Sequence, residues 1–376
     1  MMLISSETSE VLEKSVAERR ETYCSGLFLS ARWFVLSQIC KSGLQVIVLP
    51  DKDSAEYCAA DLYNLVEGDN VFFLPDSGKN VERSNYKSSL AVQRTAAVGS
   101  IIADKDNAEL LYIVTYPEAL EEMIPDKTRI SGALLTLKKD QTISFDEIVN
   151  RLTSNNFCRV DFVSAPGQFA IRGSIIDIFS YSFNNPYRIS FFGNEIEKIN
   201  VFDCNTQLSK EEKDSADIFP DIIADDENGT SDIMVSDIFP SDAVVWLDSS
   251  DVYKERSFYE GLSRFRRVYI DTPLSCTNVD PIKFNIAPQP VFNKNFELLT
   301  EDIRSRLERG YRVCIFAEKE SQADRLKSVL YQNEGVMPEF IAGKNIHRGF
   351  IDNENKICCY TDHEIFDRFH RVTIRR

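Results

Sequence analysis

Residues 26–33, GLFLSARW, have the spacing of a phosphate-binding loop, G-x-x-x-x-G-K-[ST]. Such a loop uses its second glycine for close backbone approach, its lysine for the β- and γ-phosphates and its hydroxyl for Mg²⁺. Here Ala31, Arg32 and Trp33 occupy those three positions, after Gly26 and Ser30. A tryptophan cannot ligate magnesium and its bulk fills the cradle. We therefore predict an inactive nucleotide loop that does not hydrolyse ATP.

Three carboxylates, Asp161, Asp177 and Asp203, recur at the ends of strand-like runs. A metal site or an acid–base pair is one interpretation, but aspartates in such places more often cap turns. We predict no catalytic residue in the chain. Asp177 is interpreted as structural, holding Arg172 or a turn amide.

Metal-binding and disulfide spacings are missing from the sequence. The nine cysteines follow no framework, and the adjacent pair Cys358-Cys359 cannot chelate as C-x-x-C does. His347, His363 and His370 have no zinc-like spacing to those cysteines. We predict reduced cysteines, no metal and no cofactor.

Residues 166–203 are the candidate for a partner-binding surface. Their pattern predicts three antiparallel strands, at Phe169–Phe179, Tyr187–Phe192 and Glu195–Phe202. Gly193-Asn194 joins the last two, and such a pair is a strong signal for a two-residue hairpin. Side chains alternate between the two faces of a strand. The middle strand therefore has one apolar face and a second face that carries Arg188, Ser190 and Phe192.

An assumed register adds a second arginine to that face. If Ile178 lies opposite Pro186, then Arg172 lies opposite Phe192. Arginine and aromatic side chains dominate binding hot spots, so Arg172, Arg188 and Phe192 form a candidate partner-binding surface, with Ser190 as a rim contact. The alternative is that Phe192 packs under a neighbouring loop and both arginines pair with surface acids.

The same stretch resembles a known family. FAIRGSIIDIF followed by YRISFFGNEIEKINVFD is similar to the linchpin segment shared by the excision-repair protein UvrB and the bacterial transcription-repair coupling factor. The shared pattern is close to G-x-[FY]-x-x-R-G-x-x-x-D-[IL]-[FY], then R-x-x-[FW]-[FW]-x-x-[ED]-[IV]-[ED], then F-D. The resemblance implies that this segment docks on the damage sensor UvrA. It also implies that Arg172, Arg188 and Phe192 are the residues that contact it.

Composition limits the other functions. With 376 residues, 43% hydrophobic content and a net charge of −16, the chain is expected to form about two to four folded domains. An acidic surface repels phosphates, and the basic residues occur only as pairs, so gripping nucleic acid is not the expected primary role. We find no signal peptide and no apolar run of about 20 residues, and we predict a cytoplasmic protein without membrane contact.

Short apolar strands alternate with helices over the first part of the chain, which indicates α/β structure with a parallel sheet. We expect helices at Thr8–Ser25, Ala31–Lys41, Ser54–Val66, Ser88–Ala103, Ser144–Ser154, Ser250–Arg264, Phe296–Glu308 and Glu320–Tyr331. Strands are expected at Leu44–Pro50, Val71–Leu74, Leu110–Val114, Ala133–Lys139, Cys158–Val163, Ala243–Leu247, Arg267–Ile270 and Arg312–Phe316, and later at Glu339–Ile341, Phe350–Ile351 and Lys356–Tyr360. Asn205–Asp214 is expected to be a polar connector.

The resemblance divides this pattern into four parts. Residues 1–132 and 211–287 are the two halves of a degenerate P-loop, RecA-like domain similar to the UvrB motor half. By the same resemblance, residues 133–210 are expected to be an inserted mixed α+β domain that binds UvrA, and residues 288–376 a small α/β third domain. In the family the RNA-polymerase-binding domain and the helicase motors follow, so the sequence is expected to be an N-terminal fragment.

We therefore predict a recognition protein without enzymatic activity that brings UvrA, and with it nucleotide excision repair, to stalled RNA polymerase. The intact family protein is an ATP-dependent DNA translocase that contacts polymerase and double-stranded DNA through other domains. The alternative is a UvrB-like motor domain that still binds nucleotide or DNA, with Arg32 in the role of the lysine. A third possibility is a structural spacer, which would leave an exposed Phe192 beside two arginines without a purpose.

Overall fold

The computed structural model describes residues 7–66, 70–77, 84–103, 109–181, 185–204, 206–220, 222, 232–271, 279–332 and 337–368, with the side chains of 84–88 and 332 left out. The chain forms two compact units. The first unit holds residues 1–71, 107–117 and 240–375, and the second holds 72–106 and 118–239. The structure is mixed α/β, as the sequence predicts, and the four predicted parts stay predictions.

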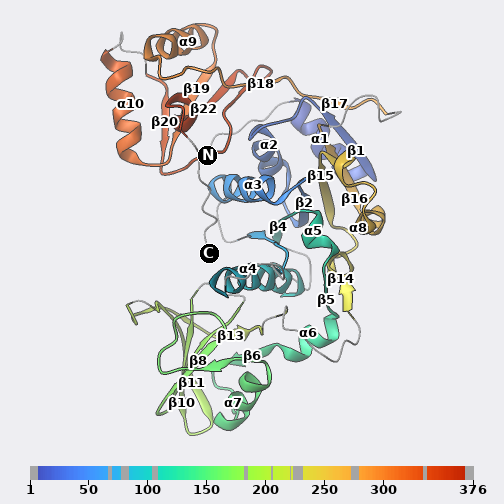
Figure 1. Cartoon of the computed structure of the whole chain (residues 1–376), viewed down its shortest axis with the longest axis vertical. Helices are drawn as coiled ribbons and strands as arrows, with labels where there is room; N and C mark the ends of the chain where they lie inside the picture. The colour runs from blue at the N-terminus through green and yellow to red at the C-terminus, as the bar shows by residue number, and fades with distance from the viewer. Residues whose placement is uncertain are drawn as a thin grey trace. The chain divides into compact units, whose positions relative to one another are not determined.

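A parallel sheet forms the centre of the first unit (Figure 1). Its neighbouring strands run in the order β17 (Ile282–Lys283), β1 (Glu21–Ser25), β16 (Arg266–Ile270), β15 (Val244–Asp248), β2 (Gly43–Val48) and β4 (Leu110–Thr115). The helices of this part are α1 (Glu7–Glu18), α2 (Ala31–Ile39), α3 (Lys52–Leu65) and α8 (Ser257–Gly261), with 3₁₀ turns at Ser250–Val252 and Leu262–Arg264. Strands β15, β2 and β4 are mostly apolar and are buried along almost their whole length, as expected for a sheet covered on both faces.

The rest of the first unit is a smaller layer of helices on a sheet, which we call the C-terminal module (residues 286–368). Its strands lie in the order β18 (Ile286–Pro288), β21 (Phe350–Asp352), β22 (Ile357–Thr361), β19 (Arg312–Ala317) and β20 (Glu339–Ala342). Helices α9 (Phe296–Glu308) and α10 (Glu320–Gln332) flank this sheet, and α11 (Asp362–Ile365) follows β22 (Figure 1). Its core includes Leu299, Ile303, Leu326, Leu330 and Tyr360, all fully buried.

A mixed sheet dominates the second unit. Its order is β12 (Ser209–Lys213), β11 (Glu195–Phe202), β10 (Tyr187–Phe192), β9 (Ile175–Phe179), β8 (Gln168–Arg172) and β7 (Cys158–Arg159). Only the β7–β8 pair is parallel. Helix α7 (Phe145–Ser154) covers one face, because its apolar residues Ile148 and Leu152 pack with Ile176, Ile189 and Ile199 in one core.

The remaining elements of the second unit are two helices, two short paired ribbons and a 3₁₀ turn. They are α4 (Ser84–Ala103), α6 (Lys127–Ala133), β6 (Leu135–Lys138) with β13 (Ser215–Ile218), β5 (Met123–Pro125) with β14 (Asp232–Met234), and Val235–Ile238. Strand β3 (Val71–Phe73) and helix α5 (Pro117–Glu121) carry the chain from the first unit into the second.

Four predicted elements outside residues 166–203 are wrong. The helix expected over Thr8–Ser25 ends at Glu18, and Glu21–Ser25 is strand β1, paired on both sides. Ser250–Arg264 is a chain of short turns around α8 rather than one helix. The expected strand Cys158–Val163 keeps only its first two residues. Within the expected connector Asn205–Asp214, whose first residue lies outside the described residues, Ser209–Lys213 is an edge strand because it pairs with β11.

Candidate functional site

Strand β10 lies at the centre of the mixed sheet, but its register differs from the assumed one. The expected strand Phe169–Phe179 is a hairpin, β8 and β9, that turns at Gly173 with a positive φ of 60°. Ile178 lies opposite Tyr187 rather than Pro186, so Arg188 faces Asp177 and Ser190 faces Ile175. The assumed register is therefore wrong by one residue. Arg172 pairs with β9 and has no direct neighbour on β10.

The corrected register still gathers the predicted residues on one face. Ala170, Asp177, Arg188 and Asn200 form one row across β8 to β11. Arg172, Ile175, Ser190 and Lys198 form the next row. Residues two apart on a strand point the same way, so both rows belong to one face. We call the face that carries Arg172, Arg188, Ser190 and Phe192 the docking face. The opposite face packs into the core with α7.

Asp177 is the central charge of the docking face and holds both arginines. It accepts hydrogen bonds from Arg188 Nε at 2.8 Å and Nη2 at 2.9 Å, and another from Arg172 Nη2. The Asp177 side chain is 1% exposed, against 38% for Arg172 and 19% for Arg188. The bond to Asp177 raises the pKa of Arg188, so this guanidinium stays charged. The predicted contact between Asp177 and Arg172 is confirmed.

Two further groups fix Arg188. Its Nη2 donates to Gln207 Oε1 at 3.0 Å and its Nη1 to the Gln207 carbonyl oxygen at 3.3 Å. Its guanidinium carbon lies 4.1 Å from the ring centroid of Phe202, which is fully buried. A guanidinium held by a carboxylate, an amide and an aromatic ring keeps little freedom to reorient.

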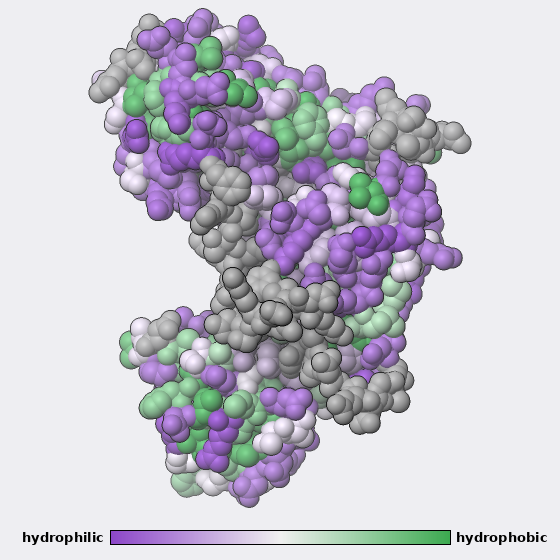
Figure 2. All heavy atoms as spheres, in the orientation of Figure 1, coloured by the Kyte–Doolittle hydropathy of each residue, from purple (hydrophilic) through white to green (hydrophobic). Residues whose placement is uncertain are grey.

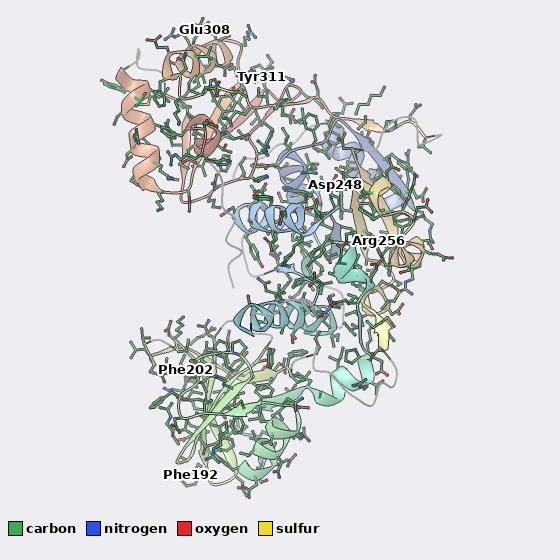
Figure 3. All side chains as sticks on the ribbon, viewed as in Figure 1. Phe192, Phe202, Asp248, Arg256, Glu308 and Tyr311 are labelled. Carbon is green, nitrogen blue, oxygen red and sulfur yellow. The ribbon has the colours of Figure 1, made fainter. Side chains whose placement is uncertain are left out.

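Phe192 is the most exposed large apolar side chain in the described part of the chain, at 81%. A β-bulge between Ser190 and Phe191 interrupts the pairing with β11, yet Phe191 is 4% exposed and packs edge-on to Phe145 at 5.5 Å. Figure 3 shows Phe192 at the hairpin end of β10–β11 and Phe202 at the other end. The alternative in which Phe192 packs under a loop is wrong, whereas both arginines do pair with an acid, the buried Asp177 rather than a surface acid.

Sequence reasoning missed two exposed apolar residues, Phe162 at 63% and Leu208 at 68%. The Arg172 guanidinium carbon lies 5.3 Å from the Phe162 ring centroid, and Leu208 follows Gln207, the partner of Arg188. Figure 2 shows apolar and polar surface interleaved over the visible side of the second unit. A signal existed in the D-F-V run at 161–163, where Phe162 alternates with the buried Val163, but it needs the fold to be placed beside Arg172.

The phosphate-loop remnant, residues 26–33, lies in the first unit and leads into α2. Gly26 has φ of 70°, and a Cβ added there would overlap the Phe284 carbonyl oxygen. Ala31 is the first residue of α2, and Ser30 precedes it without capping the helix by its side chain. The Ser30 hydroxyl instead donates to Asp61 Oδ2 at 2.6 Å and accepts the backbone N–H of Arg348 at 3.0 Å.

Arg32, the cation of the phosphate-loop remnant, is bound to other groups of the protein. Arg32 forms an ion pair with Asp248 at the end of β15, and its Nε donates to the Leu29 carbonyl oxygen at 2.9 Å. Burial raises the pKa of Asp248, and the Arg32 charge opposes that rise. Trp33, 2% exposed, lies under the guanidinium at 4.6 Å from its ring centroid. In Figure 3 Asp248 is labelled on this part of the first unit.

The C-terminal module also contacts α3, next to the phosphate-loop remnant. The His347 backbone N–H donates to Asp61 Oδ1 at 2.6 Å, the Asn64 amide donates to the Asn345 carbonyl oxygen at 2.8 Å, and the rings of Tyr57 and His347 stack at 3.5 Å. Asp61 is 1% exposed, and this burial raises the pKa of its carboxyl to about 7. The hydrogen bonds from Ser30 and His347 act in the opposite direction and lower that pKa. The residues around Ser30 thus bind protein groups.

Metal sites and membrane-spanning helices are two further possibilities for the described residues. Among these residues there is no group of three or more His, Cys, Asp or Glu side chains placed to hold a metal ion. No helix in the described ranges is long and apolar enough to cross a membrane.

Comparison with known proteins identifies the domain that carries the docking face. The family described as UvrB interaction domain matches residues 135–222. The transcription-repair-coupling factor of Bacillus subtilis strain 168 is 29% identical over 204 residues, which are 54% of this chain and 17% of that protein. The Mycobacterium bovis protein of the same name is 30% identical over 191 residues, 49% of this chain and 15% of its own length.

The Escherichia coli K12 transcription-repair-coupling factor is 35% identical over 91 residues, 24% of this chain and 8% of its own length. The chain thus spans less than a fifth of the length of these relatives. The sequence resemblance is confirmed: the chain is similar to the transcription-repair-coupling factors over about half of its length, and residues 135–222 match the family described as UvrB interaction domain.

Proposed function

We propose that this chain binds UvrA through the docking face and so brings nucleotide excision repair to stalled RNA polymerase. One observation carries the proposal. Phe192, 81% exposed, stands on the same face as two arginines that are held in place by one buried carboxylate, inside a matched UvrB interaction domain. An exposed aromatic ring beside fixed arginines is the typical composition of a binding hot spot.

Each residue has its own part in the proposed interface. Phe192 is the anchor, because its ring is the largest apolar area to be removed from water on the face. Arg172, with 38% of its side chain exposed, offers guanidinium N–H groups to carboxylates or carbonyl oxygens of the partner. Arg188 is more enclosed and supports the same charge pattern, and Ser190 contributes a rim hydroxyl. Because the arginines are already immobilised, binding costs less conformational entropy.

We also propose that the chain has no catalytic activity and takes no cofactor. The parallel sheet and the position of residues 26–33 before α2 support a degenerate P-loop, RecA-like domain. Arg32 is paired with Asp248 and Trp33 is buried, so neither is available to a nucleotide phosphate or to magnesium. ATP-driven translocation, RNA polymerase and double-stranded DNA would belong to other parts of the family protein, which acts in the cytoplasm.

The test is a titration of purified UvrA against this chain and two variants. The first variant is Arg188→Ala with Phe192→Ala. The matched control is Arg151→Ala with Met123→Ala, an arginine on α7 and a methionine of the same unit that are 52% and 51% exposed. We expect saturable binding that the first variant weakens by at least thirtyfold, about 2 kcal/mol, and that the control leaves unchanged.

The other outcomes are equally informative. If both variants bind as the unchanged chain does, the partner stands but the docking face is not its site. If the unchanged chain does not bind UvrA, the proposed function is wrong. A saturable signal from Mg²⁺ and ATP would then favour the UvrB-like nucleotide-binding alternative.

A further inference from the structure

A basic cavity lies in the C-terminal module, away from the remnant of the phosphate loop. Its volume is about 420 Å³, and it is lined by Lys294, Ser321, Gln322, Arg325, Phe366 and Arg368. Three of these six residues are cations and none is an acid. The composition is unusual for a chain with 59 acidic and 43 basic residues. A concave site with one sign of charge concentrates its field and attracts counter-ions.

Two of the cations share one aromatic ring. The guanidinium carbon of Arg325 lies 5.2 Å from the ring centroid of Phe366, and that of Arg368 lies 4.3 Å from it. Phe366 is itself fixed, because it is 5% exposed and packs edge-on to Phe296 at 5.7 Å. A cation–π contact attracts a guanidinium to the ring but leaves its charge in place, so the ring positions the two arginines without neutralising them.

Two acids near the cavity are engaged elsewhere or buried, whereas Glu320 and Asp367 are exposed neighbours that do not line it. Within the described residues, none of the three cations forms an ion pair with a carboxylate. On α10, Asp324 pairs with Lys327 at 3.0 Å. Asp362 feels the charge of Arg368, but it is 2% exposed and does not line the cavity. Positive charge therefore remains inside the cavity.

The start of helix α10 adds polar donors to this charge. Ser321 and Gln322 lie in its first turn, and α10 is 13 residues long. Gln322 Oε1 accepts the Lys319 backbone N–H at 3.0 Å, which fixes the entry to the helix. The amide dipoles of a helix favour an anion at its N-terminus. Glu320 also lies in this turn, so the arginines and Lys294 must supply most of the attraction.

We propose that this cavity binds a phosphate group. Two planar guanidinium groups with a lysine suit a tetrahedral dianion better than a single carboxylate, because each guanidinium can donate two parallel hydrogen bonds. Free inorganic phosphate and the phosphates of a nucleic acid share this chemistry. The site is independent of the docking face, since its residues belong to the other unit.

Isothermal titration calorimetry with inorganic phosphate, at constant ionic strength with chloride, tests the proposal on the full chain. The variant is Arg325→Gln with Arg368→Gln. Arg309→Gln is the matched control, an exposed arginine of the same module that does not line the cavity. We expect saturable binding that is at least tenfold weaker in the double variant and unchanged in the control. A second titration uses a short single-stranded DNA with and without a 5′-phosphate.

The two titrations distinguish a free or terminal phosphate from a backbone phosphate, and they can refute the proposal. Binding of inorganic phosphate and of the 5′-phosphorylated DNA alone places a terminal or free phosphate in the cavity. Equal binding of both DNAs, with loss in the double variant, places a backbone phosphate there. The proposal is wrong if phosphate and DNA give no saturable heat, or if the double variant binds as tightly as the unchanged chain.

Discussion

Replacing Asp177 with asparagine removes the one negative charge that holds both arginines of the docking face. Asp177 takes two hydrogen bonds from Arg188, at 2.8 and 2.9 Å, and another from Arg172. An asparagine keeps one acceptor oxygen and turns an NH₂ group toward a guanidinium, where it repels. The shape of the side chain is kept, so the change tests charge and orientation rather than packing.

The expected loss of stability in Asp177→Asn depends on the lost hydrogen bonds and on how far solvent replaces them. A hydrogen bond to a charged group contributes roughly 1.5–3 kcal/mol when it is shielded. The arginine side chains are 38% and 19% exposed, so water recovers part of each lost bond. We expect the free energy of unfolding to fall by about 2 kcal/mol. Binding of UvrA should weaken by a further roughly thirtyfold, because two released arginines each cost about 1 kcal/mol to order again.

Two measurements give these numbers separately. Chemical unfolding followed by circular dichroism reports the stability, and a UvrA titration below the unfolding transition reports the binding. The matched control is Asp140→Asn, which removes the same charge at an exposed turn position with a positive φ of 65° that asparagine tolerates. If Asp177→Asn binds UvrA as tightly as the unchanged chain, the arginines do not need this carboxylate and the argument for a preorganised face is refuted.

Three further predictions concern the first unit. Because burial raises the Asp61 pKa from 3.8 to about 7, the folded state binds a proton that the unfolded state releases, so stability should fall as pH rises from about 4 to 7. Asp61→Asn should remove this contribution, and melting curves across that pH range compare the slopes. Gly26→Ala should lower the free energy of unfolding by more than about 2 kcal/mol, because the position has a positive φ and the added Cβ would overlap the Phe284 carbonyl oxygen. Gly173→Ala is the control: it also has a positive φ but has open space around it, so it should lower the free energy of unfolding by only about 1 kcal/mol. An equal loss in both would show that the carbonyl contact is unimportant. Trp33→Ala should cost about 3–5 kcal/mol in urea unfolding and yield no Mg²⁺-dependent ATP binding by calorimetry; a gain of binding would mean that the tryptophan alone blocks the site.

The sequence predicted those elements whose signals are local. Helix α9 has the predicted bounds, Phe296–Glu308, because its apolar residues recur at helical spacing and Gly310 follows it with φ of 80°. Helix α7 was predicted over Ser144–Ser154, and it begins right after Ser144, whose Oγ accepts the Glu147 backbone N–H at 3.1 Å. Such signals involve residues a few positions apart and need no knowledge of the fold.

Elements that depend on distant partners were missed. Glu21–Ser25 continues a helical pattern in sequence, but it becomes β1 because β16, paired at Glu21↔Arg267, offers it a parallel neighbour. Ser209–Lys213 is entirely polar and has no burial pattern of its own. It becomes an edge strand through β11, with Glu212 bonded to Lys198 at 3.0 Å.

The docking face combines features that local sequence signals predict with features that depend on the fold. Strand alternation predicted that Arg188, Ser190 and Phe192 share a face, and the structure agrees because parity does not depend on register. The tight turn at Gly173 was missed, since Arg-Gly-Ser lies inside an otherwise apolar run. Placing Arg172 beside Asp177 and Phe162 required the hairpin that this turn makes.

The interrupted sequence of the first unit affects how the chain can fold. Strands β2 and β15 are hydrogen-bonded neighbours, with Val244 opposite Gln45, yet about two hundred residues separate them along the chain. Such pairings have high contact order and form slowly, because a long loop must close before the contact is made. During synthesis β2 must wait until β15 has left the ribosome, whereas the core of residues 135–218 is contiguous and can fold first. The domain that carries the docking face would then be complete while the sheet of the first unit is still open.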